Sequence, residues 1–216
     1  MKRGRERKEE MVFMDKSAAF IPERKATVSR KTGETAITVT INLDGAGTAE
    51  IHTGIGFFDH MLESFSRHGF FDLKVEAEGD LHVDCHHTIE DTGIVLGTAV
   101  RQALGGKKAV RRYGSIMLPM DETLVLCALD LSGRPYFVYD VSFQGERIGE
   151  FDTQMVKEFF YAISYSCGMN LHMKKLYGEN DHHIAEAVFK AFAKALDEAS
   201  GLDGRISNVL STKGSL

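Results

Sequence analysis

Cysteine is scarce in this chain of 216 residues, occurring only at Cys85, Cys127 and Cys167. The irregular spacing forms neither a disulfide framework nor a paired-cysteine metal clip. We therefore expect a reducing, cytoplasmic environment. Cys85 stands beside His86 and offers a thiolate as a metal ligand, but a half-buried apolar cysteine is the commoner arrangement.

Two further absences concern apolar runs and positive charge. The first 20 residues are rich in charge, and they contain no apolar segment long enough for a signal peptide or a membrane span. Asp and Glu number 31 against 26 Lys and Arg, which gives a formal net charge of −5. Both signs are mixed along most of the chain, so we expect neither a nucleic-acid partner nor a membrane partner.

Hydrophobic periodicity predicts both strands and helices. Strands are expected where apolar residues alternate, in residues 35–45, 71–79, 123–131, 136–143 and 170–176. Helices are expected in residues 57–69, 87–104, 153–168 and 182–196. Ser132–Pro135 has the composition of a hairpin turn, and residues 107–115 have that of a connector. Strands followed by grouped helices favour an α+β fold in which the helices cover one face of each sheet.

An internal repeat divides the chain. The pattern HHxxE occurs at residues 86–90 and 182–186, and each copy opens a predicted helix. Each copy also has an upstream partner in a Phe-rich helix, His60 in the first case and Glu158 in the second. Duplication of one unit explains this register. We expect a first half at 24–106 and a second half at 107–216, which together form one compact catalytic unit, and a charged N-terminal extension at 1–23.

The repeat carries metal-type ligands. Residues four apart on a helix differ by about 40° in direction, whereas adjacent residues differ by about 100°. His86 and Glu90 can therefore face one ion while His87 faces elsewhere, and the second copy predicts the same for His182 and Glu186. Imidazole and carboxylate donors without thiolate suit Mn, Fe, Co or Zn, and favour an expanded, manganese-like shell. A surface cluster and a purely structural metal remain alternatives.

Five segments together resemble the imidazoleglycerol-phosphate dehydratase family. They are TGIGFFDHML (53–62), GDLHVDCHHTIEDTGIVLG (79–97), SGRPY (132–136), LYGENDHHIAEAVFKAFAKAL (176–196) and STKG (211–214). The similarity covers about residues 24 to 216. It implies an α+β fold of two duplicated halves, each a mostly antiparallel sheet covered by two helices, of the ribosomal protein S5 domain 2-like type. It also implies a homo-oligomeric shell of 24 subunits.

The resemblance implies a lyase of histidine biosynthesis that converts imidazole glycerol phosphate to imidazole acetol phosphate and water. The reaction would proceed through a metal-bound imidazolate and elimination of the hydroxyl, with two Mn²⁺ ions per active site and ligands from neighbouring chains. One ion would take His60, His87, His182 and Glu186, and the other His86, Glu90, Glu158 and His183. Many members carry histidine at position 158, but a glutamate oxygen also ligates manganese. His172 is a rival ligand, or a strand histidine with an ordinary hydrogen bond.

The same resemblance assigns roles around the substrate. Glu34 matches the acid/base glutamate, although alone it reads as an exposed loop acid. The residues that match the substrate-binding and phosphate side are His68, Arg112, Arg134, Lys190, Ser211 and Lys213. Taken together, these donors favour an anionic substrate.

Two other functions remain open from the residues alone. A dinuclear metallohydrolase would require a bridging carboxylate, for which Asp59, Asp91 and Asp181 are candidates. A non-catalytic, metal-stabilised shell would explain the histidines, but it leaves Glu34 and the cationic residues without a role.

Overall fold

The structure is a computed structural model that describes residues 23–216. The expected N-terminal extension therefore lies outside the described residues, except for Glu23. The described residues form two four-stranded sheets, four helices and a short two-stranded ribbon.

The first sheet and its helices come from the first half of the chain. The strands are β1 (Lys25–Lys31), β2 (Thr35–Asn42), β3 (Ala49–His52) and β4 (Asp72–Gly79), and the helices are α1 (Gly56–Gly69) and α2 (His86–Leu104). The strand order is β1-β2-β4-β3. The β1–β2 and β2–β4 pairs are antiparallel, and the β3–β4 pair is parallel.

The second half repeats this arrangement. Its strands are β5 (Tyr113–Met120), β6 (Thr123–Asp130), β7 (Tyr136–Asp140) and β10 (Asn170–Tyr177), its helices are α3 (Gln154–Cys167) and α4 (Asp181–Ser200), and β8 (Arg147–Ile148) and β9 (Phe151–Asp152) form the ribbon before α3. The order β5-β6-β10-β7 again combines two antiparallel pairs with one parallel pair. The prediction of an α+β fold with two mostly antiparallel sheets, each carrying two helices, is confirmed.

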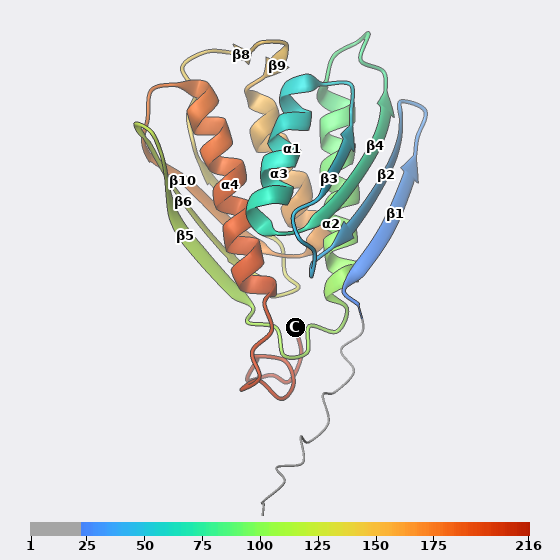
Figure 1. Cartoon of the computed structure of the whole chain (residues 1–216), viewed down its shortest axis with the longest axis vertical. Helices are drawn as coiled ribbons and strands as arrows, with labels where there is room; N and C mark the ends of the chain where they lie inside the picture. Colours follow the sequence, from blue (N-terminus) through green and yellow to red (C-terminus); the bar gives the residue numbers. More distant parts are fainter. Residues whose placement is uncertain (1–22) are drawn as a thin grey trace, which may run out of the picture.

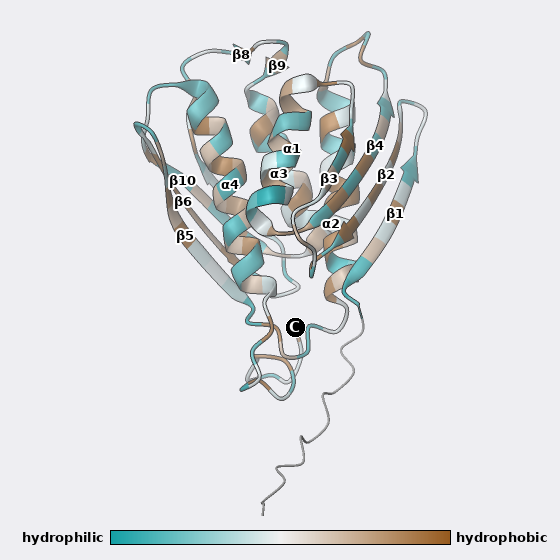
Figure 2. Cartoon of the chain, in the orientation of Figure 1, coloured by the Kyte–Doolittle hydropathy of each residue, from teal (hydrophilic) through white to brown (hydrophobic). Residues whose placement is uncertain are grey.

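The helices fill the space between the two sheets (Figure 1). α2 packs against β1, β2 and α3, whereas α4 packs against β5, β6 and α1. In β2, Ile37, Val39 and Ile41 are buried while the residues between them are partly exposed, because alternate side chains of a strand face opposite sides of the sheet. Figure 2 shows the resulting interleaving of apolar and polar residues along the strands and helices.

A glycine sets the close approach of α2 to α3. A Cβ atom at Gly97 would lie 2.7 Å from the backbone oxygen of Ile163, which is too short for any side chain. Only glycine permits this separation of the two helices. The approach matters for the site because α2 carries Glu90 and α3 carries Glu158.

Two local predictions were wrong. Ser132–Pro135 does not close a hairpin, because β10 lies between β6 and β7 and pairs with β7 in parallel. The turn itself forms, with Gly133 at φ 77°. The chain after it enters β7, which is separated from β6 by the later strand β10. The supposed connector at 107–115 ends inside β5, which starts at Tyr113 and pairs with β6.

Phenylalanine rings from α1, α3 and α4 meet at the centre of the core. The ring centroids of Phe159 and Phe189 lie 5.3 Å apart, and those of Phe58 and Phe159 lie 5.1 Å apart. All three rings are almost completely buried. Large buried rings dominate the energetics of such cores, so this cluster fixes how the helices of the two halves pack together.

We expect Phe159→Ala to lower the free energy of unfolding by about 3–5 kcal/mol, because it removes a buried ring and leaves a cavity. Denaturant unfolding followed by circular dichroism at constant protein concentration measures this loss. Phe70→Ala is the matched control, since the Phe70 side chain is 54% exposed. Equal losses for the two variants would contradict the role of Phe159 in the core.

Candidate active site

All four helices begin at the same end of the molecule (Figure 1). Every residue that the sequence predicted as a metal ligand lies within the first two turns of one of these helices. The duplicated register therefore places the ligands of α1 and α4, and those of α2 and α3, at one end of the sandwich.

Three predicted ligands from α1 and α4 meet directly. His60, His182 and Glu186 each offer one ligand atom, and these atoms lie within 4.8 Å of one another. His182 Nε2 is 3.2 Å from Glu186 Oε2, and His60 Nε2 is 3.8 Å from the same oxygen. The i, i+4 spacing on α4 and the packing of α1 against α4 bring them together. Two imidazoles and a carboxylate on one centre form a donor set that suits Mn²⁺ or a related ion.

Lys190 lies one turn further along α4 and touches this cluster. Its Nζ atom is 2.6 Å from Glu186 Oε1. Burial of Glu186 disfavours its charged form, but the hydrogen bond and positive charge of Lys190 outweigh burial and hold the pKa of Glu186 below its usual value. The ionised form of Glu186 is therefore favoured, with one oxygen facing the histidines and the other facing Lys190.

The second group of predicted ligands lies on α2 and α3. His86 Nε2 is 3.8 Å from Glu90 Oε2, one helical turn away. Glu158 lies on α3, which packs against α2. Within residues 23–216, however, the ligand atoms of His86, Glu90 and Glu158 do not all lie within 4.8 Å of one another.

The second histidine of each HHxxE pair points away from the first, as the helical angle predicted. The ring centroids of His86 and His87 lie 6.0 Å apart with an interplanar angle of 75°, and those of His182 and His183 lie 6.3 Å apart at 85°. Within the described part of one chain, His87 does not join the cluster of His60. The predicted ligand sets are therefore only partly assembled by a single chain.

His87 and His183 instead contact carboxylates through Nδ1. Asp80 oxygens lie 3.0 and 3.2 Å from His87 Nδ1, and a Glu122 oxygen lies 2.7 Å from His183 Nδ1. Glu34 is also near His87, with Oε2 3.8 Å from Nδ1. Sequence reasoning missed Asp80 and Glu122, because both belong to loops whose position depends on the tertiary fold.

Most of the predicted phosphate-side residues meet at the other end of the molecule. One pocket is lined by Arg112, Arg134, Ser211 and Lys213, together with Tyr113, Val209, Leu210, Thr212 and Leu216. The Arg112 guanidinium is engaged there: it donates to both oxygens of Asp130, at 2.6 and 3.0 Å, and to the Leu210 carbonyl at 2.7 Å. Within residues 23–216, no carboxylate pairs with Arg134 or Lys213. These two cations are the available charges of the pocket.

The other two predicted substrate-binding residues lie elsewhere. Lys190 is beside the metal-type cluster, and His68 is near Lys190 at the end of α1. Burial, followed by the charge of Lys190, lowers the pKa of His68. Burial and the charge of Lys190 therefore favour the neutral form of the His68 ring.

The two ends are too far apart for one small substrate. Arg112 lies against the last turn of α4, where its backbone N–H donates to the Ala199 carbonyl at 2.9 Å, whereas His182 lies in the first turn. At 1.5 Å per residue, the helix between His182 and Ala199 is about 25 Å long. A substrate with one imidazole and one phosphate cannot span this length within one chain.

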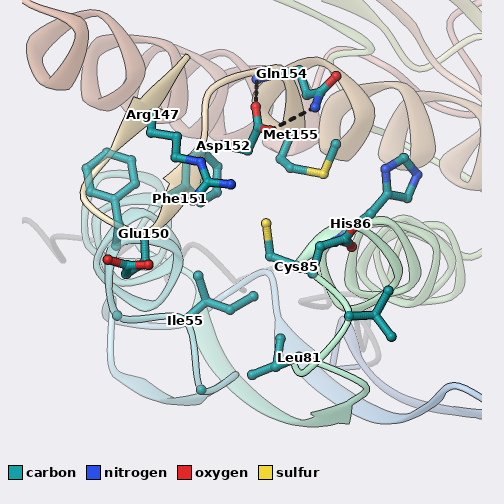
Figure 3. A pocket seen from close by; sticks show the side chains of 15 residues that line it. Ile55, Leu81, Cys85, His86, Arg147, Glu150, Phe151, Asp152, Gln154 and Met155 are labelled. Atoms are coloured by element: carbon teal, nitrogen blue, oxygen red, sulfur yellow. Dashed lines mark hydrogen bonds between the residues drawn. The ribbon is translucent and has the colours of Figure 1, made fainter. Parts of the chain in front are cut away.

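A separate pocket of about 440 Å³ opens beside His86 (Figure 3). Cys85, Ile55, Leu81 and Met155 present apolar atoms to it, and Arg147 and Glu150 come from the segment around the β8–β9 ribbon. Cys85 is half-buried in this lining, as expected for an apolar cysteine. The pocket shows that the loop before α2 leaves accessible space next to a predicted ligand.

Side chains that could bind a metal also occur at two places on the outer surfaces of the sheets. His172 is exposed on β10 and lies against Tyr136, with the ring centroids 6.5 Å apart, so it faces away from the helices. Glu50, His52 and Glu76 also offer ligand atoms within 4.8 Å of one another. Lys74 already neutralises both of these carboxylates, at 2.5 and 3.4 Å.

Comparison with known proteins identifies the family. The family model described as imidazoleglycerol-phosphate dehydratase matches residues 53–196. The chain is 67% identical over 193 residues to the protein of that name from Lachnoclostridium phytofermentans, with 89% of this chain and 98% of that protein covered. This chain belongs to the imidazoleglycerol-phosphate dehydratase family. The resemblance inferred from the sequence is confirmed.

Other relatives agree with this assignment. The imidazoleglycerol-phosphate dehydratase of Acetivibrio thermocellus is 60% identical over 194 residues, covering 90% of this chain and 100% of that protein. The crystal structure from Staphylococcus aureus has a TM-score of 0.76 at 38% identity, covering 83% of this chain and 99% of that chain. The structure from Pyrococcus furiosus has a TM-score of 0.75 at 37% identity, covering 88% and 100%.

Membership of the imidazoleglycerol-phosphate dehydratase family makes the chain a dehydratase of histidine biosynthesis and thus a lyase. The part that matches the family model contains all the predicted metal ligands. Within residues 23–216, none of the helices is both long and apolar enough to cross a membrane.

Proposed function

We propose that this chain converts imidazole glycerol phosphate to imidazole acetol phosphate and water, in the cytoplasm, with two Mn²⁺ ions per active site. The observation that carries the proposal is the meeting of His60, His182 and Glu186 within 4.8 Å. The relatives named above support the substrate, and the histidine-rich donor set supports the metal.

The donors of His60, His182 and Glu186 fit such an ion. One ion would be held by His60, His182, Glu186 and His87, and the other by His86, Glu90, Glu158 and His183. Bound ions would supply positive charge that stabilises the anionic form of the substrate's imidazole ring. The ionised Glu186 carboxylate and the neutral rings of the histidines are the ligand forms that such a centre requires.

Glu34 is proposed as the group that moves the proton on the carbon chain. Its side chain is 58% exposed, and its carboxylate lies 3.8 Å from His87 Nδ1, beyond hydrogen-bond distance. The carboxylate is therefore uncommitted yet adjacent to a predicted ligand. A base in this position takes the C–H proton from the carbon adjacent to the ring-bearing carbon, while the hydroxyl on the ring-bearing carbon is lost as water, and the resulting enol becomes the ketone.

The phosphate would be bound by a second copy of the chain. Arg134 and Lys213 offer unpaired positive charge at the end of the molecule opposite to the metal-type cluster. Because about 25 Å separates the two ends, we propose that the cluster of one chain faces the phosphate pocket of a neighbour. A closed shell of 24 copies, as expected from the resemblance, would repeat this contact at every site.

The hydrolase alternative is less well supported. Its candidate bridging carboxylates already have structural partners: Asp59 accepts bonds from Thr53, Asp91 from Arg30 and Thr35, and Asp181 from the backbone of Gln144 and Gly145. None of the three belongs to the cluster of His60, His182 and Glu186. A metal-stabilised shell without catalysis disagrees with the family assignment.

We expect chelator-stripped protein to lose turnover of imidazole glycerol phosphate and to regain it when Mn²⁺ is restored. Turnover is measured by formation of the ketone product, and sedimentation is recorded alongside it to follow assembly. Zn²⁺ and Mg²⁺ serve as comparison ions. Full turnover by metal-free protein would overturn the metal-dependent mechanism, and failure of the metal-loaded, assembled protein to act would overturn the substrate assignment.

A further inference from the structure

We propose that Asp80 and Glu122 are positioning residues that orient the imidazole rings of His87 and His183 toward the ions. The inference deepens the proposed function, on which it rests. It assigns roles to two carboxylates outside the predicted ligand sets, and it separates the task of Glu34 from theirs.

The hydrogen bonds fix which nitrogen of each ring is available. An ionised carboxylate only accepts hydrogen bonds, so a ring nitrogen that contacts one must donate. His87 Nδ1 donates to Asp80 and His183 Nδ1 donates to Glu122. In a neutral ring this leaves the lone pair on Nε2, which then becomes the ligand atom. The two carboxylates thus select the tautomer as well as the direction of each ring.

Glu122 also anchors the helix that carries His183. Its Oε1 atom accepts the backbone N–H groups of Glu179 and Asn180, at 3.2 and 2.9 Å. Asn180 in turn caps α4 by accepting the backbone N–H groups of His182 and His183. One carboxylate therefore fixes both the start of α4 and the ring of its second histidine. Asp121, which lies in the same β5–β6 turn as Glu122, places its Oδ2 atom 3.6 Å from His183 Nε2.

The duplicated fold makes Glu122 the counterpart of Glu34. Glu34 lies in the β1–β2 turn and Glu122 in the β5–β6 turn, and these strand pairs occupy equivalent places in the two sheets. Each glutamate directly precedes a buried threonine, Thr35 or Thr123, that opens the next strand. Each approaches the second histidine of the HHxxE helix in its own half.

The two halves then differ in one respect. In the second half, Glu122 itself holds the histidine at 2.7 Å. In the first half, Asp80 holds His87 at 3.0 Å, which leaves the Glu34 carboxylate at 3.8 Å without that hydrogen bond. We infer that Asp80 frees Glu34 for proton transfer, whereas Glu122 has a positioning role only.

The test compares Mn²⁺ affinity in full-length Glu122→Gln and Asp80→Ala, using the electron paramagnetic resonance signal of free Mn²⁺. In Glu122→Gln the amide oxygen can still accept from the backbone N–H groups of Glu179 and Asn180, but the NH₂ group faces His183 Nδ1 and favours the wrong tautomer. We expect the affinity of each variant to fall about 10- to 100-fold, as for other partners of metal-ligating histidines. Excess Mn²⁺ should restore turnover in Glu122→Gln, because Glu122 has a positioning role only.

Matched controls keep the result specific. Glu78→Gln and Glu179→Gln remove exposed carboxylates near Asp80 and Glu122, and should leave the affinity unchanged. Glu122→Asp, which keeps the charge, should recover part of the affinity, and melting of the stripped proteins shows that each variant folds. Affinities of Glu122→Gln and Asp80→Ala within twofold of wild type would overturn the inference. Mn²⁺ binding that depends on both carboxylates in a protein that does not dehydrate the substrate would uphold the inference while refuting the proposed function.

Discussion

Glu34→Gln should reduce turnover of imidazole glycerol phosphate about 100- to 10,000-fold, the range lost when a general acid or base is removed. The substitution keeps the size and polarity of the side chain but removes its capacity to accept a proton. Steady-state turnover at saturating Mn²⁺ measures the effect. The loss should fall on kcat rather than on KM, because the proposed step is proton transfer and not substrate binding.

Metal content and assembly should not change in Glu34→Gln. The carboxylate lies beyond hydrogen-bond distance from His87, and Asp80 holds that ring instead. Metal analysis and sedimentation therefore serve as internal controls, and Glu78→Gln is the matched surface variant. Turnover within threefold of wild type, with metal bound, would remove Glu34 from the mechanism. A parallel loss of Mn²⁺ would instead make it a ligand-positioning residue like Asp80.

The helices were the most predictable part of the fold. Their apolar period continues over three turns or more, and each prediction fell within a few residues of the observed bounds, as for α1 at Gly56–Gly69 and α2 at His86–Leu104. Strands whose inner faces pack on helices, such as β2 and β6, were also found, because alternation follows directly from one-sided burial.

Two of the strands that were missed lack that signal. β1 has a mostly exposed burial pattern and β3 has only four residues, so neither shows clear alternation. The parallel pairing of β7 with β10 could not be read locally, because the partner follows only after the ribbon and α3. Local turn composition at Ser132–Pro135 predicted a turn correctly but not the strand on its far side.

In the candidate site, too, local geometry was predicted from the sequence, whereas features that depend on the tertiary fold were not. The helical spacing predicted that His182 and Glu186 lie together while His183 turns away, and the structure shows this geometry because it is local. The duplicated register paired His60 with His86, whereas the packing of α1 on α4 brings His60 to His182 and Glu186 of the other half. Asp80 and Glu122 carry no local signal, since ordinary turns contain such acids. The pocket lined by Arg134 and Lys213 lies at the opposite end of α4. The sequence could not predict this separation, because it depends on how α4 runs through the fold.

Because the histidine cluster and the phosphate pocket lie at opposite ends of one chain, the proposal that two chains share one active site can be tested directly. A chain with a damaged cluster keeps its phosphate pocket, and a chain with a damaged pocket keeps its cluster. If each site combines the two from different chains, a mixed assembly contains sites in which both parts are intact. Arg112 is unsuitable as the pocket variant, because its bonds to Asp130 and Leu210 hold the C-terminal segment in place. Arg134 and Lys213 are better choices.

We expect His182→Asn and the double variant Arg134→Ala, Lys213→Ala to be nearly inactive alone and to recover activity when co-expressed with different tags and purified as mixed shells. Random mixing of equal amounts should give about a quarter of the wild-type rate, because half of the clusters and half of the pockets are intact. Co-expression of His182→Asn with His60→Asn is the matched control: both residues belong to one cluster of one chain, so no mixture restores it. Mixed shells that are no more active than their parents would mean that cluster and pocket act within the same chain, which the length of α4 argues against.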